Sequence, residues 1–151
     1  MISDYKTKFL HKVPVQIRFN DIDVIGHVNN AMYFQYLDYA RMNYFKQVFD
    51  DVIYWRKKGL ILAKMEMEYY EPVFLGENIS VCTKIEKIGN KSIQMHQHIV
   101  KDSDDEELIA SCTSILVGYD YTEQASMKVP PAWKEKVLDY EKNVLIKSSR
   151  I

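Results

Sequence analysis

The sequence predicts an α+β protein in which a curved antiparallel sheet wraps one long central helix. The first observation is a helical stretch at residues 30–49 that contains no proline or glycine. The second is a series of four or five segments in which apolar and polar residues alternate, as they do in half-buried strands. The third is the order of these elements, because one helix followed by consecutive antiparallel strands is typical of an α+β layout.

The predicted helix carries apolar or aromatic side chains around most of its circumference. Such a helix is surrounded by protein rather than lying on a surface. Asn29 or Asn30 is a suitable N-cap, because a short amide side chain can accept from the unpaired amides of the first turn. The start of the helix therefore lies beside the loop at residues 21–27.

The predicted strands precede and follow this helix, and turn residues separate them. Gly89-Asn90 forms one turn, and the acidic run at 102–107 forms a hairpin loop. Pro130-Pro131 opens a short C-terminal helix at about 131–142, since proline suits a first helical turn. The expected strands occupy residues 12–20, 60–71, 79–85, 93–99 and about 107–121.

Length and composition indicate one globular domain, residues 1–151, with a core at about 10–122. Twenty basic and twenty-one acidic residues leave a net charge of −1. This balance argues against a nucleic-acid or membrane partner. Cys82 and Cys112 are predicted to be buried thiols, because their spacing fits no metal or disulfide framework. The sequence shows no signal peptide or membrane-spanning run, so we expect a cytoplasmic protein.

The loop before the helix concentrates residues that are capable of chemistry. It contains two carboxylates, Asp21 and Asp23, then Gly26-His27 and Asn29-Asn30. Gly26 can adopt dihedral angles that other residues rarely reach. The first amides of a helix carry a partial positive charge and can bind a developing oxyanion. A carboxylate beside such amides can act as a base or a nucleophile next to a developing negative charge.

One string of residues in this region is specific enough to point to a family. It consists of Arg18, Asp21-Ile22-Asp23, Gly26-His27-Val28-Asn29-Asn30, Tyr33, Asp38 and Arg41. In this order and spacing, the residues resemble the hotdog fold, and within it the acyl-CoA thioesterases of the 4-hydroxybenzoyl-CoA thioesterase type. The similarity covers roughly residues 10–120, and Glu71-Pro72 with Gly76-Glu77 resembles the family's strand-ending proline and following turn.

The resemblance implies that Asp23 is the catalytic carboxylate and that the amide of Asn30 polarises the thioester carbonyl. His27 either transfers protons or only hydrogen-bonds the loop, and both roles remain open. Asp21 is expected to brace the loop. Asp38 and Arg41 are expected to pair with each other, because they lie three residues apart on the helix.

The candidate substrate-binding residues are Gly26, Asn29, Tyr33 and Lys91. Asn29 serves as a cap or orients the substrate, and Tyr33 belongs to the core or to a wall of the acyl pocket. Lys91 follows the predicted turn, where related enzymes place basic residues against coenzyme A phosphates, although a solvated turn lysine fits equally well.

The expected partner is an acyl-CoA, or an acyl carrier protein thioester, with no cofactor and no metal. A homodimer or homotetramer is expected, because a sheet around one helix leaves an open edge. Two other functions remain possible on this fold. A hydratase or dehydratase would need an Asp-x-Asn-Pro-x-His arrangement that this loop lacks. A non-catalytic acyl-thioester-binding subunit would not need Asp23.

Overall fold

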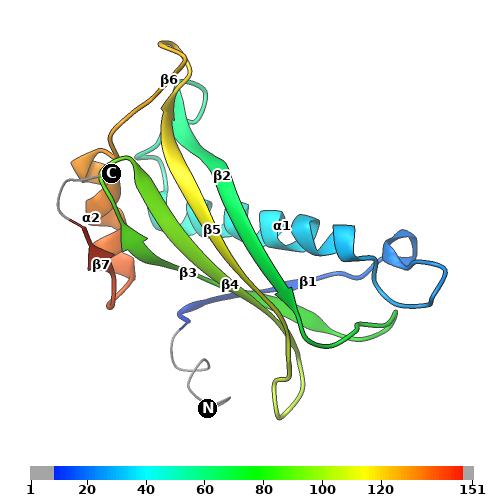
Figure 1. The fold of residues 1–151 in the computed structure, drawn as a ribbon. Coiled ribbons are helices and arrows are strands. Elements are labelled where there is room, and N and C mark those ends of the chain that lie inside the picture. Colours follow the sequence, from blue (N-terminus) through cyan, green and yellow to red (C-terminus); the bar gives the residue numbers. More distant parts are fainter. Residues whose placement is uncertain (1–8, 148–151) are drawn as a thin grey trace. The chain divides into compact units, whose positions relative to one another are not determined.

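The computed structural model describes residues 9–147, and its elements follow the predicted order (Figure 1). One helix of 20 residues precedes the main run of strands, which confirms the α+β class. The elements are β1 (His11–Val15), η2 (Phe19–Asp21), α1 (Asn30–Phe49), β2 (Lys58–Tyr69), β3 (Ile79–Ile88), β4 (Ser92–Lys101), β5 (Leu108–Asp120), β6 (Ala125–Ser126), α2 (Pro131–Tyr140) and β7 (Leu145–Ile146).

The strands form one sheet in the order β1-β3-β4-β5-β2, with β6 added to β5 and β7 added to β3. β1 and β3 are antiparallel, with Val13 opposite Val81, and β5 and β6 are antiparallel as well. The short β7, which the sequence did not predict, runs parallel to β3. β1 and β2 end the main strand order, so β2 is an edge strand.

The chain divides into two compact units. Within the described part of the chain, the first contains the residues up to 44, 67–83 and 97–112, and the second contains 45–66, 84–96 and the residues from 113 onward. The helix α1 and the four strands from β2 to β5 each contribute residues to both units. A single-domain organisation therefore stays a prediction.

In the first unit, the helical segment of α1 up to Tyr44 packs on the sheet. Leu37 and Tyr44 are fully buried. Gln97 of β4 is buried as well, and its Nε2 donates to the carbonyl oxygen of Leu37 and to Thr83 Oγ1, both at 3.1 Å. This amide joins helix and sheet through a polar contact inside an apolar core, where an unpaired donor would be costly.

In the second unit, several aromatic rings pack against one another. Phe45 stacks on Trp55 with ring centroids 5.2 Å apart, and Phe49 lies at 5.6 Å from Phe45. α2 buries Trp133 and begins with the predicted proline at its first turn. It ends at Tyr140 rather than at 142, because Glu141 has extended backbone dihedral angles.

The predicted first strand is too long at its C-terminal end. β1 ends at Val15, and residues 19–21 form a 3-10 turn instead of continuing the strand. The amide of Arg18 donates to Asp21 Oδ2 at 2.9 Å, and the amide of Asp21 donates to the carbonyl of Arg18 at 2.9 Å. An aspartate side chain that satisfies a nearby backbone amide competes with strand pairing, which explains the early end of β1.

Three other predictions are confirmed in detail. Arg41 Nη2 donates to Asp38 Oδ1 at 2.6 Å. Cys82 and Cys112 are buried free thiols, and burial raises the pKa of each to about 11. The acidic run at 102–107 connects β4 to β5.

The second predicted strand, at residues 60–71, is displaced by two residues at each end. In the structure, β2 starts at Lys58 and ends at Tyr69.

Stability is expected to depend on pH through His11. Burial lowers the pKa of His11 below its ordinary 6.5, although the contact between Nε2 and Asn43 Oδ1 at 2.9 Å opposes this shift. The folded protein therefore binds this proton less readily than the unfolded chain does. The contribution to stability is present above pH 6.5 and is lost as the pH falls below it.

Urea unfolding of the parent and of His11→Gln, above and below pH 6.5, tests this expectation. The parent should lose more free energy of unfolding on acidification than the variant, whose amide can still donate to Asn43. Equal losses in the two proteins would contradict the role of His11.

Candidate active site

A buried carboxylate holds the loop that precedes α1. Asp21 is 1% exposed, and its Oδ2 accepts from Tyr36 Oη of α1 at 2.6 Å as well as from the amide of Arg18. Its carbonyl oxygen accepts from the amide of Asn29 at 2.8 Å. Burial, followed by the contact with Asp21, raises the pKa of Tyr36 well above its usual range, so this hydroxyl remains a donor. Asp21 thus braces the loop against the helix, in agreement with the sequence-based expectation.

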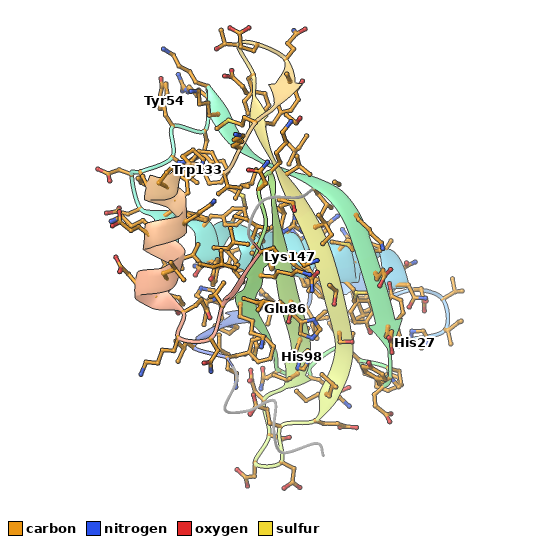
Figure 2. All side chains as sticks on the ribbon, turned by 60° about the vertical axis from the view of Figure 1, so that its left-hand side comes forward. His27, Tyr54, Glu86, His98, Trp133 and Lys147 are labelled. Atoms are coloured by element: carbon orange, nitrogen blue, oxygen red, sulfur yellow. The ribbon has the colours of Figure 1, made fainter. Side chains whose placement is uncertain are left out.

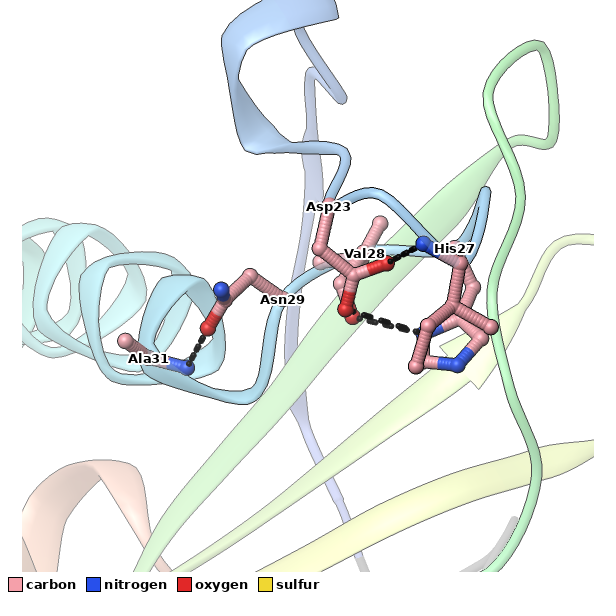
Figure 3. A network of polar contacts seen from close by, with 6 residues as sticks. Asp23, His27, Val28, Asn29 and Ala31 are labelled. Carbon is pink, nitrogen blue, oxygen red and sulfur yellow. Dashed lines mark hydrogen bonds and ion pairs between the residues drawn. The ribbon is translucent and has the colours of Figure 1, made fainter.

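Asp23 lies in a tight turn within this loop (Figure 3). Its Oδ1 accepts from the amide of Ile25 at 2.9 Å, and its amide donates to the carbonyl of His27 at 3.0 Å. Gly26 permits the turn, because its φ of +98° lies in the region that favours glycine. Asp23 Oδ2 lies 3.8 Å from His27 Nδ1, and 21% of the side chain is exposed. One carboxylate oxygen is therefore used by the turn, and the other faces the imidazole.

The contacts of His27 determine which ring nitrogen can accept a proton. Nδ1 lies 3.3 Å from the carbonyl oxygen of Val28, and a carbonyl can only accept. The neutral ring therefore carries its hydrogen on Nδ1, which leaves Nε2 as the acceptor. The ring also meets the ring of Phe74 edge-on at 6.3 Å, and the backbone of His27 bridges to that of Phe74. The contacts with Val28 and Phe74 therefore fix the position of the imidazole ring.

The helix start next to this pair is capped by Asn29. Its Oδ1 accepts from the amide of Ala31 at 2.9 Å, and the helix begins at Asn30 (Figure 3). The amide of a first helical residue has no acceptor within its own helix. The side-chain oxygen of Asn29 thus caps the helix, and its NH₂ group supplies two further donors.

A cavity of about 210 Å³ opens at this helix start. Tyr33 is 3% exposed, and its ring meets that of Tyr69 edge-on with centroids 5.2 Å apart. Burial raises the pKa of both phenols, which therefore remain protonated donors near neutral pH. The cavity is lined by His27, Asn30, Tyr33, Tyr69, Tyr70, Glu71 and Pro72.

The predicted site residues are brought together to different degrees. His27, Asn30 and Tyr33 line the cavity, and Asp23 and Asn29 contact the loop and helix start beside it. Asp23 itself contacts His27 but is not among the lining residues. Gly26 lies in an exposed part of the loop. Lys91 belongs to the second unit, where its Nζ lies 3.4 Å from Ser126 Oγ.

Sequence reasoning missed the two tyrosines that end β2 and line the cavity. Tyr69 and Tyr70 precede Glu71-Pro72, and the sequence pattern of this segment indicates only a strand that ends at a proline. The sequence feature that could have revealed them is a pair of adjacent aromatic residues at the end of a predicted strand. Figure 2 shows that His27 lies near this end of β2. A pair of this kind becomes significant only when the strand is known to end beside the helix start.

Within residues 9–147, no group of three or more histidine, cysteine, aspartate or glutamate side chains is arranged to hold a metal ion. His96 and His98 are separated by one residue, a spacing that a metal site could use, but His96 Nδ1 lies 2.9 Å from Thr113 Oγ1. In the same part of the chain, α1 and α2 are too short or too polar to cross a membrane.

Comparison with known proteins places this geometry in a family. The chain is 28% identical over 94 residues to the uncharacterized protein YsmA of Bacillus subtilis, a match that covers 62% of this chain and spans 63% of that relative. It is 21% identical to the long-chain acyl-CoA thioesterase FadM of Escherichia coli, over 82% of this chain and 93% of FadM.

A solved thioesterase from Thermus thermophilus, complexed with coenzyme A and Zn, has a TM-score of 0.79 and 28% identity to this chain. The match covers 91% of this chain and 98% of that protein. The model of the thioesterase-like superfamily matches residues 17–137, which include the whole loop, α1 and the strands from β2 to β5. The resemblance to hotdog-fold thioesterases is thereby confirmed, and the chain belongs to the thioesterase-like superfamily.

Proposed function

We propose that this protein hydrolyses acyl-CoA thioesters, with Asp23 as general base or nucleophile and the amide of Asn30 as oxyanion donor. Membership of the thioesterase-like superfamily supports the reaction class. Similarity to the long-chain acyl-CoA thioesterase FadM and to the coenzyme A-bound thioesterase of Thermus thermophilus supports the substrate class. The observation that carries the proposal is that His27, which lies 3.8 Å from Asp23, and Asn30, the first residue of α1, line the same cavity.

The chemistry assigns a step to each of these groups. Asp23 takes a proton from water, directly or through His27 Nε2, and the water oxygen attacks the thioester carbonyl carbon. In the nucleophilic variant, the carboxylate attacks and water then hydrolyses the mixed anhydride. The carbonyl oxygen becomes negative and is stabilised by the amide of Asn30, an effect worth about a hundred- to a thousand-fold in rate. The C–S bond breaks, and the thiolate of coenzyme A takes up a proton.

The remaining candidates have positioning roles in this proposal. Gly26 allows the turn that presents Asp23, Asn29 caps the helix whose amide acts, and Tyr33 forms a wall beside the acyl group. Lys91 remains a candidate for the coenzyme A phosphates. Its exposed position, with Nζ near Ser126 Oγ, is compatible with binding an anion.

Purified protein is expected to release free thiol from a panel of acyl-CoAs, which a thiol-reactive dye records continuously. Release from acyl carrier protein thioesters in preference to acyl-CoAs would identify the alternative donor. Hydration of an enoyl-CoA without thiol release would favour the hydratase alternative. Saturable binding of acyl-CoA without turnover of any thioester would favour a non-catalytic binding subunit.

The assembly and the location are part of the proposal as well. β2 ends the strand order and is the natural edge for pairing with a second copy in a homodimer, or with further copies in a homotetramer. Light scattering of the purified protein tests this, since a monomeric mass would contradict it. A cytoplasmic location remains a prediction.

A further inference from the structure

We infer that Glu77 is a positioning residue for His27, and that it acts through the turn at residues 74–77 and the ring of Phe74. The inference rests on the proposed function for its effect on catalysis, whereas the state of the His27 ring can be measured without a substrate. All three residues belong to the first unit, and the turn follows the end of β2.

The loop that carries His27 is paired with the segment that carries Phe74. The backbones of these two residues form an isolated antiparallel bridge. The amide of Val28 donates to the carbonyl of Val73 at 2.8 Å, and both valines are fully buried. Because this bond joins the neighbouring residues, His27 and Phe74 form a pair without mutual backbone hydrogen bonds, the kind in which the side chains lie closer together.

Glu77 takes up both backbone polar groups of Phe74. Its Oε1 accepts from the amide of Phe74 at 2.8 Å, and its own amide donates to the carbonyl of Phe74 at 3.2 Å. Gly76 allows this turn to close, because its φ of +93° lies in the region that favours glycine. The reciprocal bonds restrict the backbone of Phe74 and therefore the direction in which its ring points.

The carboxylate of Glu77 is itself anchored to the sheet. Its Oε2 lies 3.0 Å from Nζ of Lys101, the last residue of β4, and β4 lies between β3 and β5. Burial alone would raise the pKa of Glu77, but the bonds from Lys101 and from the amide of Phe74 outweigh it and lower the pKa below its ordinary 4.5. Glu77 therefore stays ionised at neutral pH, with one oxygen bonded to the turn and the other to the sheet.

The ring of Phe74 connects this anchored turn to the imidazole of His27. The two ring centroids are 6.3 Å apart, and the ring planes meet at 80°, an arrangement that aromatic pairs favour. Nδ1 of His27 lies 3.3 Å from the carbonyl oxygen of Val28 and 3.8 Å from Asp23 Oδ2 (Figure 3). The contact with Phe74 opposes rotation of the imidazole away from these acceptors. It thereby favours hydrogen on Nδ1 and leaves Nε2 to accept a proton from water.

The first measurement is the tautomer of His27, read by NMR from the ring-nitrogen shifts of protein that is isotopically labelled in its histidines. The chain contains four histidines, so the His27 signals are assigned by their loss in His27→Gln. We expect the neutral ring of the parent to carry its hydrogen on Nδ1. Glu77→Ala and Phe74→Leu should shift the population toward hydrogen on Nε2. Glu77→Gln keeps an oxygen for the amide of Phe74 and should resemble the parent.

The second measurement is the kinetics of thiol release by the same variants. Glu77→Ala and Phe74→Leu should lower kcat by about ten- to a hundredfold, because small displacements of a reacting group have effects of this size. KM should change by less than about twofold, since the effect falls on the transition state rather than on substrate binding. Glu77→Gln should keep kcat within about threefold of the parent's, because it retains the acceptor in the turn.

Glu86→Ala is the matched control. Glu86 is also a half-buried glutamate that accepts a side-chain hydrogen bond, from Gln94 Nε2 at 2.6 Å, but it belongs to the second unit (labelled in Figure 2). This substitution should change neither the tautomer of His27 nor kcat.

The outcomes separate this inference from the proposed function. A parent that releases thiol from no acyl-CoA would overturn the proposed function, while the tautomer would still decide whether Glu77 positions His27. An unchanged tautomer in folded Glu77→Ala and Phe74→Leu would overturn the inference, even if kcat fell. A shifted tautomer with the parent's kcat would overturn the role of Glu77 in hydrolysis. If Glu77→Ala does not fold, Phe74→Leu decides, because it leaves the backbone bonds of the turn in place.

Discussion

Asp23→Asn is expected to lower kcat for thiol release by about a hundred- to ten-thousand-fold, the range typical for loss of a positioned acid–base group. The asparagine retains an Oδ1 that can accept from the amide of Ile25, so the turn should persist. The variant loses the charge and basicity that face His27 Nδ1. Thiol release with a saturating acyl-CoA measures the effect, and circular dichroism checks the fold.

Asp120→Asn provides the matched control. Asp120 forms the same kind of turn in the second unit, where its Oδ1 accepts from the amide of Thr122 at 2.9 Å. This substitution should leave kcat unchanged within about twofold, because Asp120 does not line the cavity and the asparagine oxygen can still accept from Thr122. If Asp23→Asn hydrolyses thioesters as fast as Asp120→Asn does, then Asp23 is not the catalytic carboxylate.

Tyr36→Phe is expected to lower the free energy of unfolding by about 1.5–3 kcal/mol, the usual range for a buried hydrogen bond to a charged group. The substitution keeps the ring and removes the hydroxyl that donates to Asp21 Oδ2 at 2.6 Å. Asp21 is 1% exposed, so water cannot readily replace the lost donor. Urea unfolding at neutral pH measures the loss.

The same variant tests the brace between loop and helix. Because Asp21 also holds the amides of Arg18 and Asn29, kcat should fall in Tyr36→Phe by less than in Asp23→Asn. Tyr39→Phe is the control on the same helix, since Tyr39 is 56% exposed and should change neither quantity appreciably. Equal stability of the two phenylalanine variants would show that the Asp21 contact contributes nothing.

Much of the site was predictable because its chemistry is local in sequence. The turn at Asp23 depends on an amide two residues later, and the cap at Asn29 also acts two residues away. The start and end of the helix at residues 30 and 49 were predicted correctly, because apolar periodicity and the absence of proline and glycine act over short distances. Short-range sterics and capping thus determine both the loop and the helix that carries the proposed oxyanion donor.

Other features depend on contacts between residues that are far apart in the chain. Tyr36 and Asp21 are 15 residues apart, and the hydroxyl of Tyr69 reaches the carbonyl of Asn30 across 39 residues. No periodicity predicts such pairs. The early end of β1 has a similar origin, because Asp21 is drawn into a turn that the contact with Tyr36 stabilises.

The sequence by itself determined the α+β class, the bounds of α1 and the carboxylate, histidine and asparagine residues placed before it, since all of these follow from propensities and spacings within a few residues. Only the tertiary structure decided that Tyr69 ends β2 beside Asn30, and that the resulting cavity holds about 210 Å³. The physical reason is that the size of a cavity depends on how side chains from distant elements pack, and sequence spacing carries no information about that packing.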